Sequence, residues 1–441
     1  MSRNILRSFG VLIILINILG SARKMPAQSK PVTPQGILPS GILGPEFMIS
    51  QDTTPLGESG NEQVAFNSKH NEYLVVYDVQ PPGQPKQVFA RRVTGSGLGA
   101  LDAFAIGDAS GDNFDPSVAY DPVNDRYLIV WSANFNGEFP KYDIYGRVVT
   151  WDGLTLYNPK KIYTWAERSF VHSQVVYDSV QKDYLVAWTA LVFPQATISD
   201  VAIVRVTANG DWENNNNPMV QLMATTGNPD EVDLAYQPAN DQVLAAWSED
   251  YARSQTDTGR RVSVMLLNHD LTIANPAHQL SFCTNAANHD DPSLIPYASG
   301  HFIAACMERR VGNYSNGTEM KELDETGNEM INGGKGGVWA AWPFGTQDLA
   351  TSPGSTEWLQ LFDMQSFNSS DHEIEAMRNS NIGNGPINGF YPPTNDVRNP
   401  RVAQDSPGLI VYQGRKNGTD PLRIYGRTWV PWPLFLPFIK R

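Results

Sequence analysis

Acidic side chains are the residues of this 441-residue sequence best suited to chemistry. Asp and Glu number 46 against 33 Lys and Arg, so the formal net charge is −13. Many of these acids stand in polar stretches between short apolar runs. Such stretches form loops, where binding residues concentrate. Eight acids are our candidate binding residues: Asp78, Asp112, Asp115, Glu249, Asp250, Asp290, Asp291 and Glu308.

Three uses of these acids remain open. The simplest is a solvated acidic surface. The second is Ca²⁺, which takes several carboxylate and carbonyl oxygens. Asp108, Asp112 and Asp115 lie close enough in sequence to share an ion, although their spacing does not match an EF-hand loop. We therefore expect no cofactor, with Ca²⁺ as the alternative.

The third use is a pair of carboxyl groups that cleaves a glycosidic bond. Glycoside hydrolases place two carboxyl groups about 5 to 9.5 Å apart across the bond. Asp78 or Glu249 together with Glu308 is the candidate pair. Sequence spacing does not supply that distance, so we assign no catalytic residue and favour a protein that is not an enzyme.

Several other function classes find no support. An acidic chain has no electrostatic attraction to phosphate backbones, which argues against nucleic acid as a partner. The seven histidines form no HExxH motif, and the sequence has neither a GxSxG turn nor a phosphate-binding glycine loop.

The N-terminal end has the pattern of an export signal. Arg3 and Arg7 precede an apolar run from Phe9 to Leu19, which is short for a membrane span and is followed by small residues. We expect a signal peptide over residues 1–22, a linker over 23–43, and a secreted or cell-surface protein without a membrane span after cleavage. The two cysteines, Cys283 and Cys306, either pair or remain buried thiols.

The elements that must position the acids belong to an internal repeat. Residues 115–149 contain a short β-type run, a turn built on Pro, Asn and Asp, an apolar strand and a third strand. The pattern recurs at intervals of about 54 to 61 residues, with a fourth strand in most units. Four strands per unit of this length are typical of a β-propeller blade.

The two ends of the repeat array complement each other. The last unit ends near Trp429 without a fourth strand, and Phe47–Ser50 has the character to supply it. Such pairing closes the ring and removes exposed sheet edges. We expect an all-β, six-bladed β-propeller over residues 44–430, with four-stranded antiparallel blades and an insertion at about 309–357 in blade five. Seven blades are the alternative, because nearly two repeat lengths separate Tyr297 from Gln404.

Arginine also recurs at what we expect to be one position of the third strands, as Arg92, Arg147, Arg205 and Arg427. A residue type that returns in blade after blade indicates a repeated structural pairing rather than one central site.

The repeat resembles those of a known group of proteins. The pattern P-S-V-A-Y-D-P-x-N-x-x-Y-L-x-V-W, followed by D-I-Y-G-R-V, is similar to propeller repeats of secreted and cell-surface bacterial proteins of largely unassigned function. The apolar tail 431–441 resembles the short LP-containing tails of exported proteins of filamentous green bacteria. That resemblance implies surface retention, while packing against the last blade is the alternative. The family implies no catalytic residues.

These observations favour an exported, non-catalytic propeller that acts as a surface or extracellular-matrix binding protein. We expect its partner to be a polysaccharide, a cell-surface protein or a second copy of itself. Two alternatives are a glycoside hydrolase-like enzyme that uses carboxylates on a loop-rich face, and a structural subunit of an extracellular assembly.

Overall fold

The structure is a computed structural model. It describes residues 41–50, 61–95, 100–108, 110–134, 141–164, 168–192, 199–211, 220–222, 229–252, 258–281, 288–309, 316–340, 344–351, 357–365, 372–380, 387–390, 395–403, 408–415 and 420–431. The expected signal peptide and tail segment 432–441 lie outside these ranges, as do most of the loops between second and third strands. In the described ranges the chain forms no helix with the length and apolar character needed to cross a membrane.

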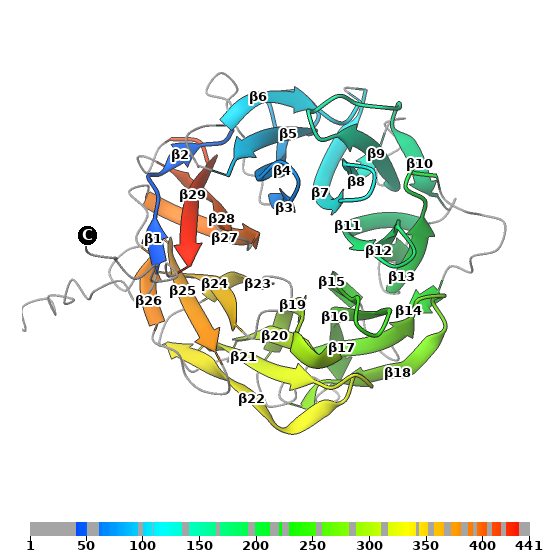
Figure 1. Ribbon diagram of the computed structural model, residues 1–441, viewed down its shortest axis with the longest axis vertical. Coiled ribbons are helices and arrows are strands. Elements are labelled where there is room, and N and C mark those ends of the chain that lie inside the picture. The colour runs from blue at the N-terminus through cyan, green and yellow to red at the C-terminus, as the bar shows by residue number, and fades with distance from the viewer. Residues whose placement is uncertain are drawn as a thin grey trace, which may run out of the picture. The chain divides into compact units, whose positions relative to one another are not determined.

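The described residues form one compact unit, a seven-bladed β-propeller in which six four-stranded antiparallel sheets and a five-stranded seventh sheet surround a central channel (Figure 1). Blades one to three contain β3 (Gln63–Asn67), β4 (Glu72–Val79), β5 (Gln87–Thr94) and β6 (Ala100–Ala105); β7 (Asp112–Asp121), β8 (Arg126–Asn134), β9 (Asp143–Thr150) and β10 (Lys160–Tyr163); and β11 (Arg168–Asp178), β12 (Asp183–Val192), β13 (Ser199–Val206) and β14 (Val220–Leu222).

Blades four to six follow in the same order. They contain β15 (Pro229–Gln237), β16 (Gln242–Ala252), β17 (Thr258–Asn268) and β18 (Ile273–Gln279); β19 (Asn288–Pro296), β20 (Phe302–Arg309), β21 (Asn316–Leu323) and β22 (Glu329–Ala340); and β23 (Phe344–Thr351), β24 (Glu357–Gln365), β25 (His372–Ser380) and β26 (Ile387–Phe390). A short 3-10 helix, Ala298–Gly300, joins β19 to β20.

Blade seven joins the two ends of the propeller and confirms the predicted ring closure. It contains β27 (Asn395–Ala403), β28 (Gly408–Arg415) and β29 (Arg423–Pro431), and its outer strands come from the N-terminal side. There β1 (Gly41–Leu43) and β2 (Phe47–Met48) both pair with β29. The backbone N–H of Ile49 donates to the carbonyl of Ile424 at 2.8 Å, which extends the pairing beyond β2.

The structure has the seven blades of our alternative, not six. The segment 309–357 is not an insertion, because it contains the two outer strands of blade five and the first strand of blade six. Ile331 and Val338 belong to the same strand, β22, although the glycine-rich stretch between them reads as a strand break in the sequence. Val338–Ala340 therefore end β22, the outermost strand of blade five, instead of starting a second strand.

The second strands are buried on both faces and supply the cores between blades. Trp131, Trp188 and Trp247 occupy the same place in β8, β12 and β16, and each is fully buried. Trp188 packs with Val130 and Ile144 of blade two, and Trp247 packs with Leu185 of blade three. This repeated contact fixes each blade against the one before it.

The recurrent arginines form structural pairings, at two strand positions rather than one. The Nε of Arg147 donates to the carbonyl of Tyr157, and the Nε of Arg427 donates to the carbonyl of Gly44, at 2.9 Å each. The neighbouring position, held by Arg92 and Arg205, points to the other face because alternate strand residues face opposite sides.

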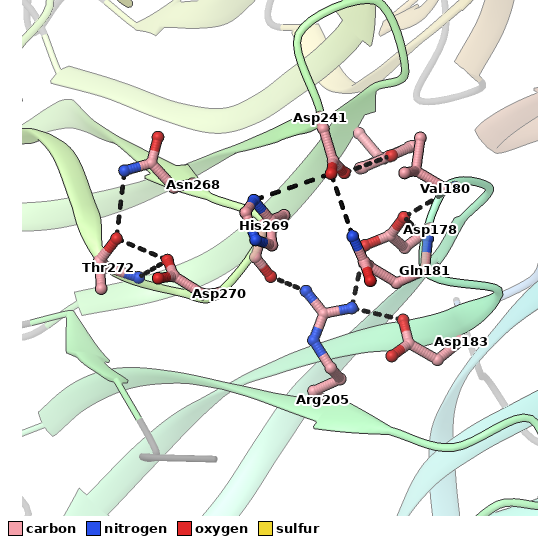
Figure 2. A network of polar contacts seen from close by, with 11 residues as sticks. Asp178, Val180, Gln181, Asp183, Arg205, Asp241, Asn268, His269, Asp270 and Thr272 are labelled. Atoms are coloured by element: carbon pink, nitrogen blue, oxygen red, sulfur yellow. Dashed lines mark hydrogen bonds and ion pairs between the residues drawn. The ribbon is translucent and has the colours of Figure 1, made fainter. Parts of the chain in front are cut away.

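Figure 2 shows the contacts of Arg205. Its guanidinium donates to Asp178 at 2.9 Å, to Asp183 and to the carbonyl of His269, so it links blade three to a turn of blade four. Gln181 extends this link by donating to Asp241 at 3.1 Å.

Cys306 lies fully buried in β20 and is disulfide-bonded. The only other cysteine of the sequence, Cys283, lies outside the described residues.

Candidate functional site

The innermost strands of the propeller share an unusual backbone feature near their starts. In β7, β11, β15 and β19 two residues bulge out of the ladder at the same place, and the first of the two has a positive φ. These residues are Asp115 (52°), His172 (52°), Glu231 (48°) and Asp291 (49°), and Asn399 of β27 has φ of 50°. The left-handed region costs a non-glycine residue about 1 to 3 kcal/mol, and such strain concentrates at functional sites.

The bulges bring these side chains together at the channel. With Asn61 of blade one and Thr346 of blade six they form what we call the bulge ring, one residue from each blade. The ring lines a cavity of about 310 Å³, the channel cavity, in the space that β3, β7, β11, β15, β19, β23 and β27 surround in Figure 1. The bulge ring comprises Asn61, Asp115, His172, Glu231, Asp291, Thr346 and Asn399.

A second ring lies two residues further along each inner strand. In several blades its side chain accepts a hydrogen bond from a backbone N–H of the next blade. Asp233 accepts from Leu294 at 2.7 Å, and Asp348 accepts from Val402 at 2.7 Å. This second ring ties consecutive inner strands together. Its members are Gln63, Ser117, Gln174, Asp233, Ser293, Asp348 and Arg401.

Acids of the bulge ring make a similar contact. The backbone N–H of Asp291 donates to Glu231 at 2.9 Å, and that of Gln347 donates to Asp291 at 2.5 Å. Asp115 accepts a longer bond, 3.4 Å, from the N–H of His172. The acids are therefore held in fixed positions around the cavity.

Burial changes the protonation of the acids at the channel. It raises the pKa of Asp233 to about 7 and that of Asp348 to about 6. Burial also raises the pKa of Glu62, which stands between Asn61 and Gln63 but does not line the cavity, to about 8. The pKa values of Asp115 and Asp291 are also raised, by burial first and then by neighbouring carboxylates. Neutral carboxyl groups, which can donate protons, thus coexist here with ionised ones.

Two cations balance this acidity. Burial alone would lower the pKa of His172, but its 2.7 Å ion pair with Asp230 and the charge of Asp115 raise it to about 9. Burial likewise opposes the charge of Arg401, but carboxylates led by Asp348 and Asp291 outweigh it and raise the Arg401 pKa. The cavity therefore combines proton donors, carboxylates, an imidazolium and a guanidinium, which is the equipment of acid–base catalysis.

The structure places three of the eight candidate residues at this cavity. Asp115 and Asp291 line it, and Asp78 lies behind it, accepting from the N–H of Asp115 at 3.3 Å. Asp290, beside Asp291 in β19, is buried but does not line the cavity.

The other candidates lie elsewhere. Asp112 accepts from the N–H of Lys86 at 2.9 Å. Glu308 is fully buried in β20, and Asp250 lies in β16 opposite Arg260. Glu249 lines a second, smaller cavity. The proposed carboxylate pairs of Asp78 or Glu249 with Glu308 therefore do not share one described cavity.

The calcium candidates do not gather either. Asp108 accepts from the N–H of Ser110 at 2.9 Å within its own turn, while Asp115 faces the channel. Across the described ranges, no three His, Cys, Asp or Glu side chains are grouped so that they could hold a metal ion. The geometry thus gives the calcium hypothesis no support.

Sequence reasoning missed most of the channel residues. Asp233, Asp348 and Arg401 stand in strands, whereas the residues predicted from the sequence came from polar stretches between apolar runs. A usable signal existed: when the repeats are aligned on V-A-Y, the preceding position changes from Ser117 to Asp233 and Arg401 while the apolar positions stay constant. A position whose residue type varies from repeat to repeat, next to apolar positions that stay constant, therefore indicates a side chain at the channel.

Comparison with known proteins supports the fold. No protein-family model matches the sequence, and no curated protein matches it either. A solved protein of unknown function from Dyadobacter fermentans is 12% identical with a TM-score of 0.51, covering 89% of this chain and all of its own.

Two solved enzymes share the architecture to a similar degree. The polysaccharide lyase Uly1 is 8% identical with a TM-score of 0.52 (85% of this chain, 90% of its own). The α-L-arabinanase of Penicillium chrysogenum, solved with arabinobiose, is 11% identical with a TM-score of 0.50 (77% and 98%). At these identities the likeness establishes a shared propeller fold.

Proposed function

We propose that the channel cavity is the active site of a carbohydrate-active enzyme that cleaves glycosidic bonds. The main evidence is the bulge ring. In it, strained backbone from successive blades presents Asp115, His172, Glu231 and Asp291 to one cavity. Left-handed non-glycine residues also recur in the turns between first and second strands, at Asn71, Asp125, Lys182 and Asp241, but those of the bulge ring line a cavity.

The pair Glu231 and Asp291 fits the required chemistry best. Burial and the charge of Glu231 raise the pKa of Asp291, so Asp291 keeps the proton that a leaving oxygen needs. Glu231, on the neighbouring blade, supplies the second carboxyl group. Asn61, Gln174 and Asn399 add neutral groups that donate and accept hydrogen bonds, as sugar hydroxyls require.

The fold comparisons agree with this proposal without carrying it. An arabinanase and a polysaccharide lyase share the architecture, and a propeller can host such activity. Function, however, depends on the site and not on the fold.

The test is product release from polysaccharides by the full-length protein. We expect reducing-end or unsaturated products from at least one member of a panel of neutral and acidic polysaccharides. Asp291→Asn should lower turnover by about 10²- to 10⁴-fold, because general acid catalysis contributes that much. Asp270→Asn, in the exposed β17–β18 turn, should keep wild-type turnover and serves as the matched control. A folded protein that cleaves nothing, or Asp291→Asn at wild-type rate, contradicts the proposal.

A non-catalytic binding protein is the second candidate. One observation favours it: Asp115, Glu231 and Asp291 each accept a backbone hydrogen bond from the next blade, so they already have a structural use. In that case calorimetry would detect oligosaccharide binding that Asp291→Asn weakens, with no product formed. Export, a cell-surface location, self-association and assembly into a larger structure also remain proposals. Sequencing the mature N-terminus of the exported protein would test the signal peptide.

A further inference from the structure

A second cavity, of about 180 Å³, lies on the face of blade four that packs against blade three. We call it the blade-four cavity. Trp247 and Glu249 of β16 line it together with side chains of the next two strands, because residues two apart in a strand share a face. The lining residues are Trp247, Glu249, Arg261, Ser263, Ala277, His278 and Gln279.

The acid that lines this cavity distinguishes blade four from blades two and three, although Glu308 holds the same position in blade five. Glu249 stands two residues after the core tryptophan. The same position holds Ala133 in blade two and Ala190 in blade three, both buried. In blade three, moreover, the rings of Tyr163 and Phe170 pack around Trp188, at 4.9 and 6.0 Å between centroids.

Blade four replaces that apolar filling with an ion pair. Arg261 Nε donates to Glu249 Oε1 at 2.8 Å, and the hydroxyl of Ser263 donates to the same oxygen at 2.7 Å. The pair is electrically neutral, and Glu249 is only 2% exposed. Charged and polar groups are expensive to bury, so their presence here needs a reason beyond packing.

Three polar atoms of the residues that line the cavity have no hydrogen-bond partner in the described part of the chain. They are Glu249 Oε2, Trp247 Nε1 and His278 Nε2. Buried polar groups are nearly always paired, so Glu249 Oε2 and His278 Nε2 indicate a missing partner. The Nε1 of Trp188 in blade three has no partner either, so Trp247 Nε1 shows only that a donor is available. The Nδ1 of His278 lies 3.0 Å from the carbonyl of Pro276, which places its proton on Nδ1 and makes Nε2 an acceptor.

We infer that the blade-four cavity binds a small neutral polyol or a single sugar residue. The cavity offers two acceptors, Glu249 Oε2 and His278 Nε2, and one donor, Trp247 Nε1. A molecule with adjacent hydroxyl groups satisfies all three, because each hydroxyl both donates and accepts. Its volume far exceeds the roughly 30 Å³ share of one water and is below the 300 Å³ or so of drug-sized sites.

The site is independent of the channel cavity. Asp291→Asn changes the channel cavity and not the blade-four cavity. A protein that cleaves no polysaccharide would therefore contradict the proposed function but would still be expected to bind a polyol in the blade-four cavity.

Titration of the full-length protein with glycerol, xylitol, D-glucose and L-arabinose tests the inference. We expect at least one probe to bind, seen by calorimetry and by a change in tryptophan fluorescence that Trp247→Phe removes. Glu249→Gln and His278→Ala should each weaken binding about tenfold or more, while Asp291→Asn leaves it unchanged. His278 is partly exposed, so its variant tests the site even if substitutions at Glu249 impair folding.

Glu308→Gln is the matched control. Glu308 holds the same position in blade five, two residues after Cys306, and is buried, but it does not line the cavity. Its variant should bind like the wild type. The inference fails if folded protein binds none of the four probes, if Glu249→Gln and Trp247→Phe bind as well as wild type, or if crystals soaked with the probes hold only water there.

Discussion

The carboxyl group of Glu62 shows how a single buried residue can link this fold to pH. Glu62 is 1% exposed, and burial raises its pKa to about 8 from the ordinary 4.5, although Arg401 and Gln413 partly offset the effect. The folded protein therefore binds a proton between these values that the unfolded chain has released. Stability falls as pH rises through this window, because the folded state binds more protons. Asp233 and Asp348 act in the same direction.

Replacing Glu62 by glutamine should remove part of this dependence. Gln keeps the shape and stays neutral, so Glu62→Gln should match the wild type near pH 4.5. Near pH 8 it should be more stable, by an amount on the order of 1 to 4 kcal/mol, given about 1.4 kcal/mol per pKa unit. Thermal melting between pH 4.5 and 9 measures this. Parallel profiles for both proteins would contradict it, and Glu325→Gln, on an exposed side chain, is the control.

His172 contributes to the same trend with the opposite kind of charge. Its pKa of about 9 lies above the ordinary 6.5, so the stabilisation by its ion pair is complete below pH 6.5 and is lost as pH rises through 9. The neutral acids and the charged histidine have the same effect: the folded protein binds more protons at the channel than the unfolded chain does.

At the scale of the strand, the bulge determines where the channel side chains point. His172 has φ of 52°, while Ser173, beside it in the same bulge, is not among the positive-φ residues. Glycine is relaxed at positive φ but loses entropy in an ordinary strand. The two positions therefore form a matched pair for measuring strain.

We expect His172→Gly to change stability by less than about 1 kcal/mol, because relief of strain offsets the lost ion pair. Ser173→Gly should cost about 1 to 2 kcal/mol, because it loses the 3.1 Å bond from its hydroxyl to the carbonyl of Asp115 as well as strand entropy. Urea unfolding measures both. Equal destabilisation by the two changes would show that the bulge stores no strain.

Strands could be predicted from the sequence because their apolar runs are so regular. Tyr127–Trp131 and Tyr184–Trp188 carry the same pattern, and the spare strand at Phe47 fits the incomplete last blade. Blade six could not be recognised as easily, because the glycines of β22 make this single strand of blade five read as two separate segments. The channel site could not be predicted in the same way, because Glu231 and Asp291 lie 60 residues apart and meet only when blades four and five pack against each other.

For the whole propeller, closure of blade seven is the decisive contact. Tyr412 donates to Glu46 at 2.6 Å, and Ile49 is fully buried against the core of blades one and seven. Without β1 and β2, the edge of β29 would be exposed, and exposed edges promote aggregation.

A variant without residues 1–50 should therefore melt earlier and aggregate, as measured by thermal melting and light scattering. Removal of the Ile49 side chain alone, in Ile49→Ala, should cost about 2 to 5 kcal/mol. Gly41 pairs with Pro431, so a short linker can join these two residues in a circular permutant. This permutant keeps β1 and β2 and should have the stability that the truncated variant loses. A truncated protein that stays monomeric with the wild-type melting temperature would contradict this role.

The pairing of β1 and β2 with β29 also sets an order of events during protein synthesis. Phe47 leaves the ribosome well before its partner Gly426, which follows about 380 residues later in the sequence. At 5 to 20 residues per second, roughly 20 to 80 s pass between them. During that interval β1 and β2 lack their partner strand, β29, so the ring cannot close before β29 has been made.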